Sequence, residues 1–354
     1  MVQDIEKFEN FTQTANAIRV FLVIGVQLTI KLGIIGYRNH ASRLISLCAQ
    51  IESCKIEFIY HPTKSLDDQR FTNNFSDLLN CDAIIIATPN HTHFEYIKKL
   101  LENFNGYIFC EKPPVTSLND IETLVKLPTK TKEKVFFNFN HRFSRLGKII
   151  ENIQEHMDSS STQIGNIIHI NFVMNHGLAF KEQYLKSWRS NGQKNLHNIL
   201  DTLTIHYLDL CNFLFGNPLH VSYFPSLMSK NGSSYDTCNL SVQYVDGKTV
   251  SISNSYATPY INEISIIGTN GVISISENQL NIRSPRDTFD EKGFFTAAPI
   301  ISSQEFDTEN EYDDSLKNSL SYFISKIEKG KPISLEHFKT SLETNRLILQ
   351  LHNK

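Results

Sequence analysis

The amino-acid sequence predicts an α/β protein of two domains, in which a doubly wound parallel sheet precedes a domain with an open, largely antiparallel sheet. From Thr29 to about Phe139, short β-branched runs alternate with amphipathic stretches, a pattern typical of repeated βαβ units. Beyond about residue 164, longer alternating segments are joined by turn sequences such as Asp246-Gly247 and Asn270-Gly271, which favour antiparallel hairpins. The chain has 354 residues, of which 40% are hydrophobic, so it can build two cores.

The elements of the first region follow from where the β-branched runs stop and the helical periodicity begins. Ser117 is a plausible N-cap for the last of its three helices. Strands are expected at 29–35, 55–60, 82–88, 106–110 and 134–138, and helices at 41–51, 94–103 and 118–127.

The second region is expected to contain a hairpin, formed by 239–244 and 248–253, and two helices. One helix covers 201–215 and ends at Gly216, and the other covers 315–329. Three parts of the chain are predicted: an N-terminal extension at 1–28, a first domain at 29–145 and a second domain at 146–354. The prediction also allows the C-terminal helices to pack against the first domain.

Composition excludes several classes of protein. The formal net charge of −3 comes from well-mixed acids and bases, so no surface for nucleic acid or an anionic membrane is expected. The six cysteines include no Cys-x-x-Cys pair and are interpreted as free thiols in a reducing compartment, the cytoplasm. The apolar run Val20 to Val26 is too short to span a bilayer, and acidic residues precede it, so no membrane anchor or signal peptide is expected.

Ligands of an open parallel sheet bind beyond the carboxyl ends of its strands, so the residues after each strand are the candidates for chemistry. The first strand runs into a glycine pattern in which Gly36 permits a tight turn and Ala41 permits close helix packing under a pyrophosphate. Arg38 stands where the pattern normally has its middle glycine, so either the loop is displaced or the guanidinium itself contacts a phosphate. The pattern predicts a Rossmann-type dinucleotide site that includes Gly36, Tyr37, Arg38, Asn39 and His40.

The second strand ends at His61 without an Asp or Glu that could accept hydrogen bonds from a ribose 2′-hydroxyl. This favours NADP slightly over NAD, with Lys64, Arg38 or Arg43 as partners of the 2′-phosphate. The same cations are equally well explained as solvated loop residues, so the choice between NAD and NADP stays open.

The third and fourth strands run into the motifs that are most specific. They are Ala87-Thr88-Pro89-Asn90-His91-Thr92-His93 and Cys110-Glu111-Lys112-Pro113, and further motifs follow in Asn138 to Ser144, in Ser187-Trp188-Arg189 and in Ile205 to Leu210. Together they resemble the glucose-fructose oxidoreductase and inositol dehydrogenase family, known as Gfo/Idh/MocA, over nearly everything after residue 29. The resemblance implies a nicotinamide cofactor bound in part by Thr88, Pro89, Asn90, His93 and Glu111.

The resemblance also implies that Lys112 lies beside the nicotinamide and the reacting carbon, where an ammonium can stabilise a developing alkoxide. His206 is the favoured general base, because an imidazole can take a hydroxyl proton at neutral pH. The family places an acid four positions before this histidine, but here that position holds Thr202 and the acid is Asp201. In a regular helix Asp201 would point about 140° away from His206, so either Asp201 reaches the site from an irregular helix start or Thr202 replaces it.

Residues expected to bind substrate are Asn140 and Arg142 after the fifth strand, Trp188, Arg189, and Lys112, Thr202 and His206 from the catalytic set. An indole face can cover a pyranose ring and a guanidinium can bind phosphate or carboxylate, although a tryptophan at the domain seam is an equally good explanation. His91 and His93 have no third ligand at a suitable spacing, so no metal is expected.

The predicted function is hydride transfer to or from a sugar, sugar nucleotide or cyclitol carbon. The alternative is a dinucleotide-binding sensor of the same fold that transfers no hydride, which the Arg38 substitution and the displaced Asp201 favour. The resemblance further implies a homo-oligomer formed through the C-terminal sheet.

Overall fold

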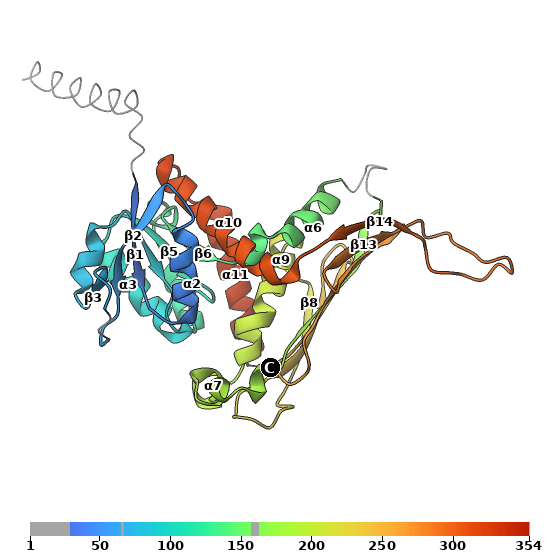
Figure 1. Cartoon of the computed structure of the whole chain (residues 1–354), viewed down its shortest axis with the longest axis horizontal. Coiled ribbons are helices and arrows are strands. Elements are labelled where there is room, and N and C mark those ends of the chain that lie inside the picture. The colour runs from blue at the N-terminus through green and yellow to red at the C-terminus, as the bar shows by residue number, and fades with distance from the viewer. Residues whose placement is uncertain (1–28, 65–66, 157–162, 354) are drawn as a thin grey trace, which may run out of the picture.

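The computed structural model describes residues 29–64, 67–156 and 163–353, so the predicted extension at 1–28 lies outside the described residues. The chain forms two sheets with helices packed between them (Figure 1). The first sheet has six parallel strands in the order β3-β2-β1-β4-β5-β6, the doubly wound arrangement expected of a dinucleotide-binding domain.

Five of the six strands of the first sheet lie close to their predicted positions, since these five are largely buried apolar runs that a parallel sheet covers on both faces. They are β1 (Ile30–Ile35), β2 (Cys54–Tyr60), β3 (Phe71–Thr72), β4 (Ala83–Ile86), β5 (Tyr107–Glu111) and β6 (Val135–Asn138). The helices are α2 (Asn39–Cys48), α3 (His93–Asn103), α4 (Leu118–Val125) and the short α5 (Thr129–Lys132). Ser117 caps α4 as predicted, because its side chain accepts a hydrogen bond from the amide of Asp120. The two-residue strand β3 was missed, because it is too short to show a periodicity.

The second sheet has eight strands in the order β14-β13-β12-β11-β7-β10-β9-β8. All its neighbours are antiparallel except β7 and β10, so the sheet is mixed and largely antiparallel. Both predicted hairpin turns are confirmed, at Asp246-Gly247 and Asn270-Gly271. The strands are β7 (Ile167–Asn175), β8 (His220–Ser226), β9 (Thr237–Gln243), β10 (Thr249–Ser255), β11 (Ile261–Gly268), β12 (Val272–Ser276), β13 (Gln279–Arg283) and β14 (Ile300–Glu305).

One face of this sheet packs against helices, and its inward side chains alternate with outward ones along each strand (Figure 1). The outward face carries a row of small polar residues that crosses the whole sheet in register. Its members are Ser222, Ser241, Ser251, Asn171, Ser265, Ser274, Asn281 and Ser303.

The helices of the second region are α6 (Arg145–Glu155), α7 (Glu182–Leu185), α8 (Gly192–Asn195), α9 (Ile205–Phe215), α10 (Thr308–Glu328) and α11 (Leu335–Leu351). Helix α9 ends at Gly216, whose positive φ of 83° suits glycine. The predicted helix at 315–329 is the C-terminal part of α10, whereas α6, α7, α8 and α11 were not predicted.

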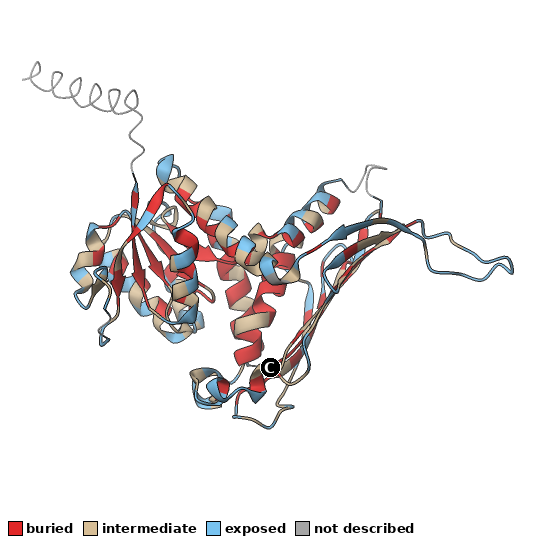
Figure 2. Cartoon of the chain, in the orientation of Figure 1, coloured by how far each residue is buried: buried red, intermediate tan, exposed pale blue. Residues whose placement is uncertain are grey.

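Helices α10 and α11 return to the first domain. Leu316, Leu320 and Phe323 of α10 share one buried cluster with Leu32 and Ile34 of β1. Figure 2 shows buried residues continuing from the parallel sheet into α11 and α9. The last part of the chain therefore completes the core of the domain that comes first in the sequence.

Candidate functional site

The loop after β1 has the shape that a dinucleotide phosphate needs. Gly36 has a φ of 113°, and a Cβ added to it would lie 2.5 Å from the carbonyl oxygen of Ala87, so only glycine fits. Arg38 is the N-cap of α2 and is exposed together with Asn39, while Tyr37 is partly buried. The amides at the start of α2 therefore face the end of the sheet, with a guanidinium where the pattern normally has its middle glycine.

Several buried polar atoms around this edge have no hydrogen-bond partner among the described residues. They are Nδ2 of Asn90, Nδ1 of His141 and Nδ1 of His206. Buried polar groups are normally paired, so these atoms together with the Gly36 cradle fit a site that a polar ligand completes. The residues present therefore fit a dinucleotide.

Three cationic or basic side chains gather at the ends of β1 and β2. Burial lowers the pKa of His61, and the charges of Lys64 and Arg38 lower it further, so the three groups lie near one another. The ring of His61 also accepts hydrogen bonds at Nδ1 from the amides of Thr63 and Lys64, at 3.2 and 3.1 Å. Arg43 is separate from this cluster, since its guanidinium pairs with Asp313 of α10 at 3.3 Å.

His93 contacts two loops at this edge of the parallel sheet. Its side chain is fully buried, with Nδ1 2.8 Å from the carbonyl oxygen of Pro113 and Nε2 2.9 Å from that of Thr88. The neutral ring donates one of these two hydrogen bonds and packs between the loops that follow β4 and β5. The expectation that His93 binds the cofactor is corrected, because its side chain is fully buried between these loops. Thr88, Pro89 and Asn90 remain partly exposed at the same edge.

Glu111 is buried at the end of β5 and is held by two partners. Its Oε1 lies 2.8 Å from Nε2 of His40 and accepts a hydrogen bond of 2.8 Å from Asn138. Asn138 in turn accepts a hydrogen bond from the hydroxyl of Ser319 on α10. Despite burial, these contacts hold the pKa of Glu111 below its usual value, so the carboxylate is charged and fixes the peptide that leads to Lys112.

Lys112 crosses from the first domain to the second. Its Nζ donates a hydrogen bond of 2.6 Å to the backbone carbonyl oxygen of Thr202. Burial lowers the pKa of Lys112 to about 8. The negative charges of Glu111 and Asp201 oppose this shift, whereas the positive charge of Arg189 adds to it. The ammonium is therefore present at neutral pH but is easily deprotonated for a lysine.

His206 lies in α9 near Lys112. Burial lowers its pKa well below the ordinary value, and the charge of Lys112 lowers it further. The ring of His141 stacks on that of His206, with centroids 4.7 Å apart. Burial lowers the pKa of His141 to about 4, with a further contribution from Lys112, so both imidazoles are neutral at pH 7. A neutral ring can accept a proton, as a general base requires.

Asp201 reaches the site through an irregular turn. Residues Leu200–Thr204 form a π-helix, in which the amide of Ile205 bonds the carbonyl of Leu200 five positions back. In an α-helix residues four apart share a face, but a π turn adds one residue and brings residues five apart together. The π turn therefore changes the angle between Asp201 and His206 from the offset of about 140° in a regular helix. The charge of Asp201 also raises the pKa of Lys112, which places the two groups near each other.

Thr202 takes part in a second set of polar contacts. Its hydroxyl donates to the carbonyl of Asn198 at 2.6 Å and bonds the hydroxyl of Tyr256 at 2.7 Å. The ring of His176 stacks on Tyr256 with centroids 4.8 Å apart. Tyr256 and His176 follow β10 and β7, so the ends of two strands of the second sheet face the same turn as Lys112.

Arg189 lies close enough to Lys112 and His176 for its charge to act on them, and Trp188 lies beside it. The guanidinium carbon of Arg189 is 5.7 Å from the centroid of the Trp188 ring. Arg189 is exposed. Burial is the main cause of the lowered pKa values of Lys112 and His176, and the charge of Arg189 lowers both further. Trp188 lines an open pocket of about 760 Å³ next to this loop. The loop thus presents a cation to the site and an indole to the pocket.

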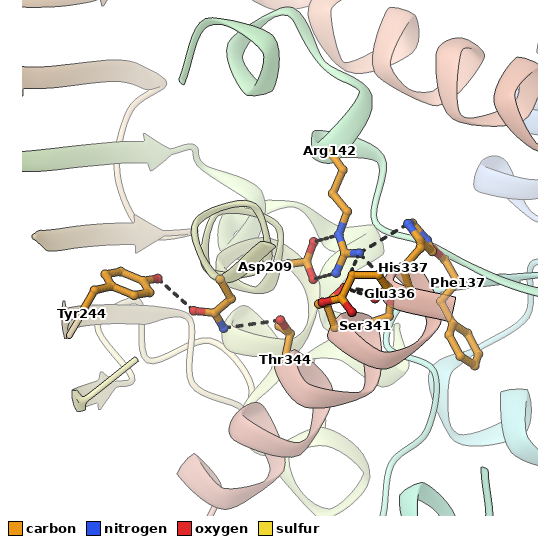
Figure 3. Close-up of polar contacts among 10 residues, drawn as sticks. Phe137, Arg142, Asp209, Tyr244, Glu336, His337, Ser341 and Thr344 are labelled. Atoms are coloured by element: carbon orange, nitrogen blue, oxygen red, sulfur yellow. Dashed lines mark hydrogen bonds and ion pairs between the residues drawn. The ribbon is translucent and has the colours of Figure 1, made fainter. Parts of the chain in front are cut away.

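Arg142 is placed away from the expected substrate position. Its Nε and Nη2 donate to the carboxylate of Asp209 at 2.7 and 2.6 Å (Figure 3). Its Nη1 donates to the hydroxyl of Thr340 at 2.9 Å. The two charged side chains are 1% and 0% exposed. The expectation that Arg142 contacts substrate is corrected, because its donors are used inside the protein. Asn140 is buried too and donates to Ser315 of α10 at 2.6 Å, so it also joins elements of the fold.

Sequence reasoning missed the roles of His141, His176 and Tyr256. His141 belongs to a motif that was recognised, and the polar end of a strand could have drawn attention to His176. Tyr256 carries no signal in the sequence. No group of three potential ligands among the described residues could hold a metal ion. No helix within the same residues is long and apolar enough to cross a membrane.

Comparison with known proteins identifies relatives of both domains. Residues 30–139 match the family model described as "Oxidoreductase family, NAD-binding Rossmann fold", and residues 154–274 match "GFO/IDH/MocA C-terminal domain". An inositol 2-dehydrogenase of Rhizobium meliloti (strain 1021) is 28% identical over 260 residues, which cover 72% of each chain.

Solved structures share the whole architecture. A myo-inositol dehydrogenase from Corynebacterium glutamicum aligns with a TM-score of 0.68 and 20% identity, covering 92% of this chain and 95% of that one. An oxidoreductase from Agrobacterium radiobacter, solved in complex with NAD+, L-tartaric acid and magnesium, aligns with a TM-score of 0.70 and 18% identity, covering 90% and 94%. These likenesses show the fold.

Proposed function

The chain belongs to the Gfo/Idh/MocA family of oxidoreductases, and from this premise we propose that it transfers a hydride between NADP and a hydroxyl-bearing carbon of a sugar or cyclitol. A single observation carries the proposal: the ammonium of Lys112, from the dinucleotide-binding domain, bonds the carbonyl of Thr202 between Asp201 and His206. Loops that are far apart in the sequence thus bring a cation, an acid and a neutral imidazole to one place. This is the set of groups that oxidation of an alcohol needs.

Each residue of the proposed site has one chemical role. Lys112 donates a hydrogen bond to the substrate oxygen and stabilises the negative charge that develops on it. His206, neutral at pH 7, accepts the proton of the hydroxyl. A nicotinamide held by the loop after β1 would supply the hydride-transfer chemistry. Asp201 supplies negative charge that favours the protonated form of Lys112.

The loop after β1 and the three basic groups beside it would hold the dinucleotide. Gly36 and the start of α2 fit its pyrophosphate, and the Arg38, His61 and Lys64 cluster fits a 2′-phosphate. A guanidinium and an ammonium near one another favour the dianionic ligand, which is why we propose NADP rather than NAD.

A titration with each cofactor tests this choice. We expect NADP to bind more tightly than NAD, and Lys64→Ala to weaken NADP binding by about tenfold while leaving NAD binding unchanged. Lys126→Ala, which removes an exposed cation at the end of α4, is the matched control. Equal loss of affinity for both cofactors, or tighter binding of NAD by the unsubstituted chain, would contradict the choice.

The substrate side of the site is rich in groups that bond hydroxyls. Tyr256, His176 and Thr202 form one polar wall, and Arg189 stands at its edge. The relative named inositol 2-dehydrogenase supports a cyclitol or a sugar as the substrate class. A panel of cyclitols, sugars and sugar nucleotides, followed by nicotinamide absorbance, tests it. We expect turnover with at least one member and its loss in Lys112→Met; binding of cofactor without any turnover would support the sensor alternative instead.

We propose that the chain pairs with a second copy through the uncovered face of the second sheet, in a reducing cytoplasm where its six buried cysteines stay free. Hydroxyls and carboxamides both donate and accept hydrogen bonds, so the Ser and Asn row is complementary to itself across a two-fold axis. Phe224, which is 62% exposed on the same face, adds apolar area. Light scattering should give at least a dimer for the unsubstituted chain, and a monomer for Ser251→Arg with Ser265→Arg, whereas Lys130→Glu on α5 should leave the mass unchanged. A monomeric unsubstituted chain would refute the pairing.

A further inference from the structure

Near the end of the described residues, His352 contacts the acid of the candidate site. It is the C-cap of α11, and its Nε2 lies 2.8 Å from Oδ1 of Asp201. The contact joins residues 151 positions apart. Asp201 is 7% exposed, so this imidazole reaches a carboxylate that solvent barely touches.

A second histidine fixes the ring of His352. His197 stacks on it with centroids 4.3 Å apart and planes 9° apart. Nδ1 of His197 lies 3.1 Å from the hydroxyl of Tyr223 on β8. Burial and then the charge of His352 lower the pKa of His197 to about 4, so His197 is a neutral stacking partner at pH 7. The orientation of His352 is therefore set by packing on a fixed ring.

The other oxygen of Asp201 is left for the site. Oδ2 has no hydrogen bond within the part of the chain that the structure describes, and it is not a fully buried atom. Asp201 directly precedes Thr202, whose carbonyl oxygen accepts the 2.6 Å hydrogen bond from Lys112, and the charge of Asp201 raises the pKa of Lys112. A carboxylate with one oxygen held and one free keeps a fixed direction, which a freely rotating carboxylate does not.

We propose that His352 is a positioning residue for Asp201: by donating its Nε2–H to Oδ1, it holds Oδ2 toward the space shared by Lys112 and His206. The inference rests on the proposed function, since it assigns a support to one of that site's groups. The proposal makes the end of α11 part of the active site, although no motif in the sequence of α11 indicates a catalytic role.

The test compares two substitutions at His352 in the full chain. His352→Leu keeps bulk but removes the donor, whereas His352→Gln keeps an N–H that can reach the same oxygen. We expect His352→Leu to lower kcat by about ten- to hundredfold, because a small misplacement of a catalytic group costs that much. KM for the cofactor should stay within twofold, and His352→Gln should recover most of kcat. Gln350→Leu, an exposed position on the last turn of α11, is the matched control.

A double substitution separates positioning from a merely structural role. In Asp201→Asn the additional His352→Leu change should cost little more in kcat, because the group that His352 positions is already altered. A role in stability alone would lower the melting temperature of His352→Leu, leave kcat of the folded enzyme unchanged and give additive effects with Asp201→Asn. That outcome overturns the positioning role and leaves the proposed function intact. Absence of turnover by the unsubstituted chain with every substrate of the panel overturns both.

Discussion

Replacing Arg142 by methionine should destabilise the protein severely while leaving the affinity for substrate unchanged. The side chain forms an ion pair with Asp209 of α9 (Figure 3) and also bonds Thr340 of α11. All of its hydrogen bonds to Asp209 and Thr340 are 2.9 Å or shorter. The substitution leaves the carboxylate of Asp209, 0% exposed, without its partner. Because solvent cannot screen that charge, the loss is that of breaking a buried ion pair, about 3–5 kcal/mol in the free energy of unfolding.

The assay is urea denaturation followed by far-ultraviolet circular dichroism, with the free energy taken from the midpoint and slope. Asp209→Leu should cost a similar amount, and the double substitution should cost less than the two single effects added together. Lys186→Ala removes one partner of an ion pair whose side chains are 74% and 78% exposed, and it should change the midpoint little.

The reasoning would be refuted by an Arg142→Met midpoint within error of the unsubstituted chain. It would also be refuted by additive effects of Arg142→Met and Asp209→Leu. A raised KM for substrate with full stability would restore the original sequence-based expectation that Arg142 binds the ligand.

Three further outcomes are expected. Gly36→Ala should raise the dissociation constant of the dinucleotide at least fivefold, because the added Cβ would lie 2.5 Å from a carbonyl oxygen at a φ of 113°; unaltered binding in a calorimetric titration would contradict this. His93→Ala should lower the free energy of unfolding by about 2–4 kcal/mol and weaken cofactor binding, because it removes the ring between the carbonyls of Thr88 and Pro113. Urea denaturation measures the first effect and a binding titration measures the second. Lys112 has a pKa of about 8 when folded against 10.5 when unfolded, so the unfolded chain binds more protons between these pH values and stability should rise with pH there. The rise should be smaller by about 1–3 kcal/mol in Lys112→Met, and equal pH dependence in the two proteins would exclude it.

Most of the first domain could be predicted because its strands other than β3 are apolar runs with a polar motif directly after them. That pattern records both the burial of a parallel strand and the edge at which ligands bind. Lys112 and His206 were predicted as site residues in the same way, from motifs at predictable places.

The acid was harder to predict, because its position depends on a local change of helix geometry. The spacing of Asp201 and His206 conflicts with a regular helix, and only the π turn at Leu200–Thr204 removes the conflict. Arg142 was misassigned for a related reason. Its neighbours in the sequence belong to the site, but its partners Asp209 and Thr340 come from later helices whose arrangement no local pattern reveals.

The return of α10 to the parallel sheet also constrains the order in which the protein can be made. Phe109 and Phe136 on β5 and β6 pack against Phe323, with ring centroids 5.3 and 5.7 Å apart. While the ribosome is still adding the second sheet, these aromatic side chains lack the partner that α10 supplies and stay partly exposed to other nascent chains. The nucleotide-binding half therefore matures last although it is synthesised first, and a gene fragment that ends after β6 should yield an aggregating product rather than an isolated cofactor-binding module.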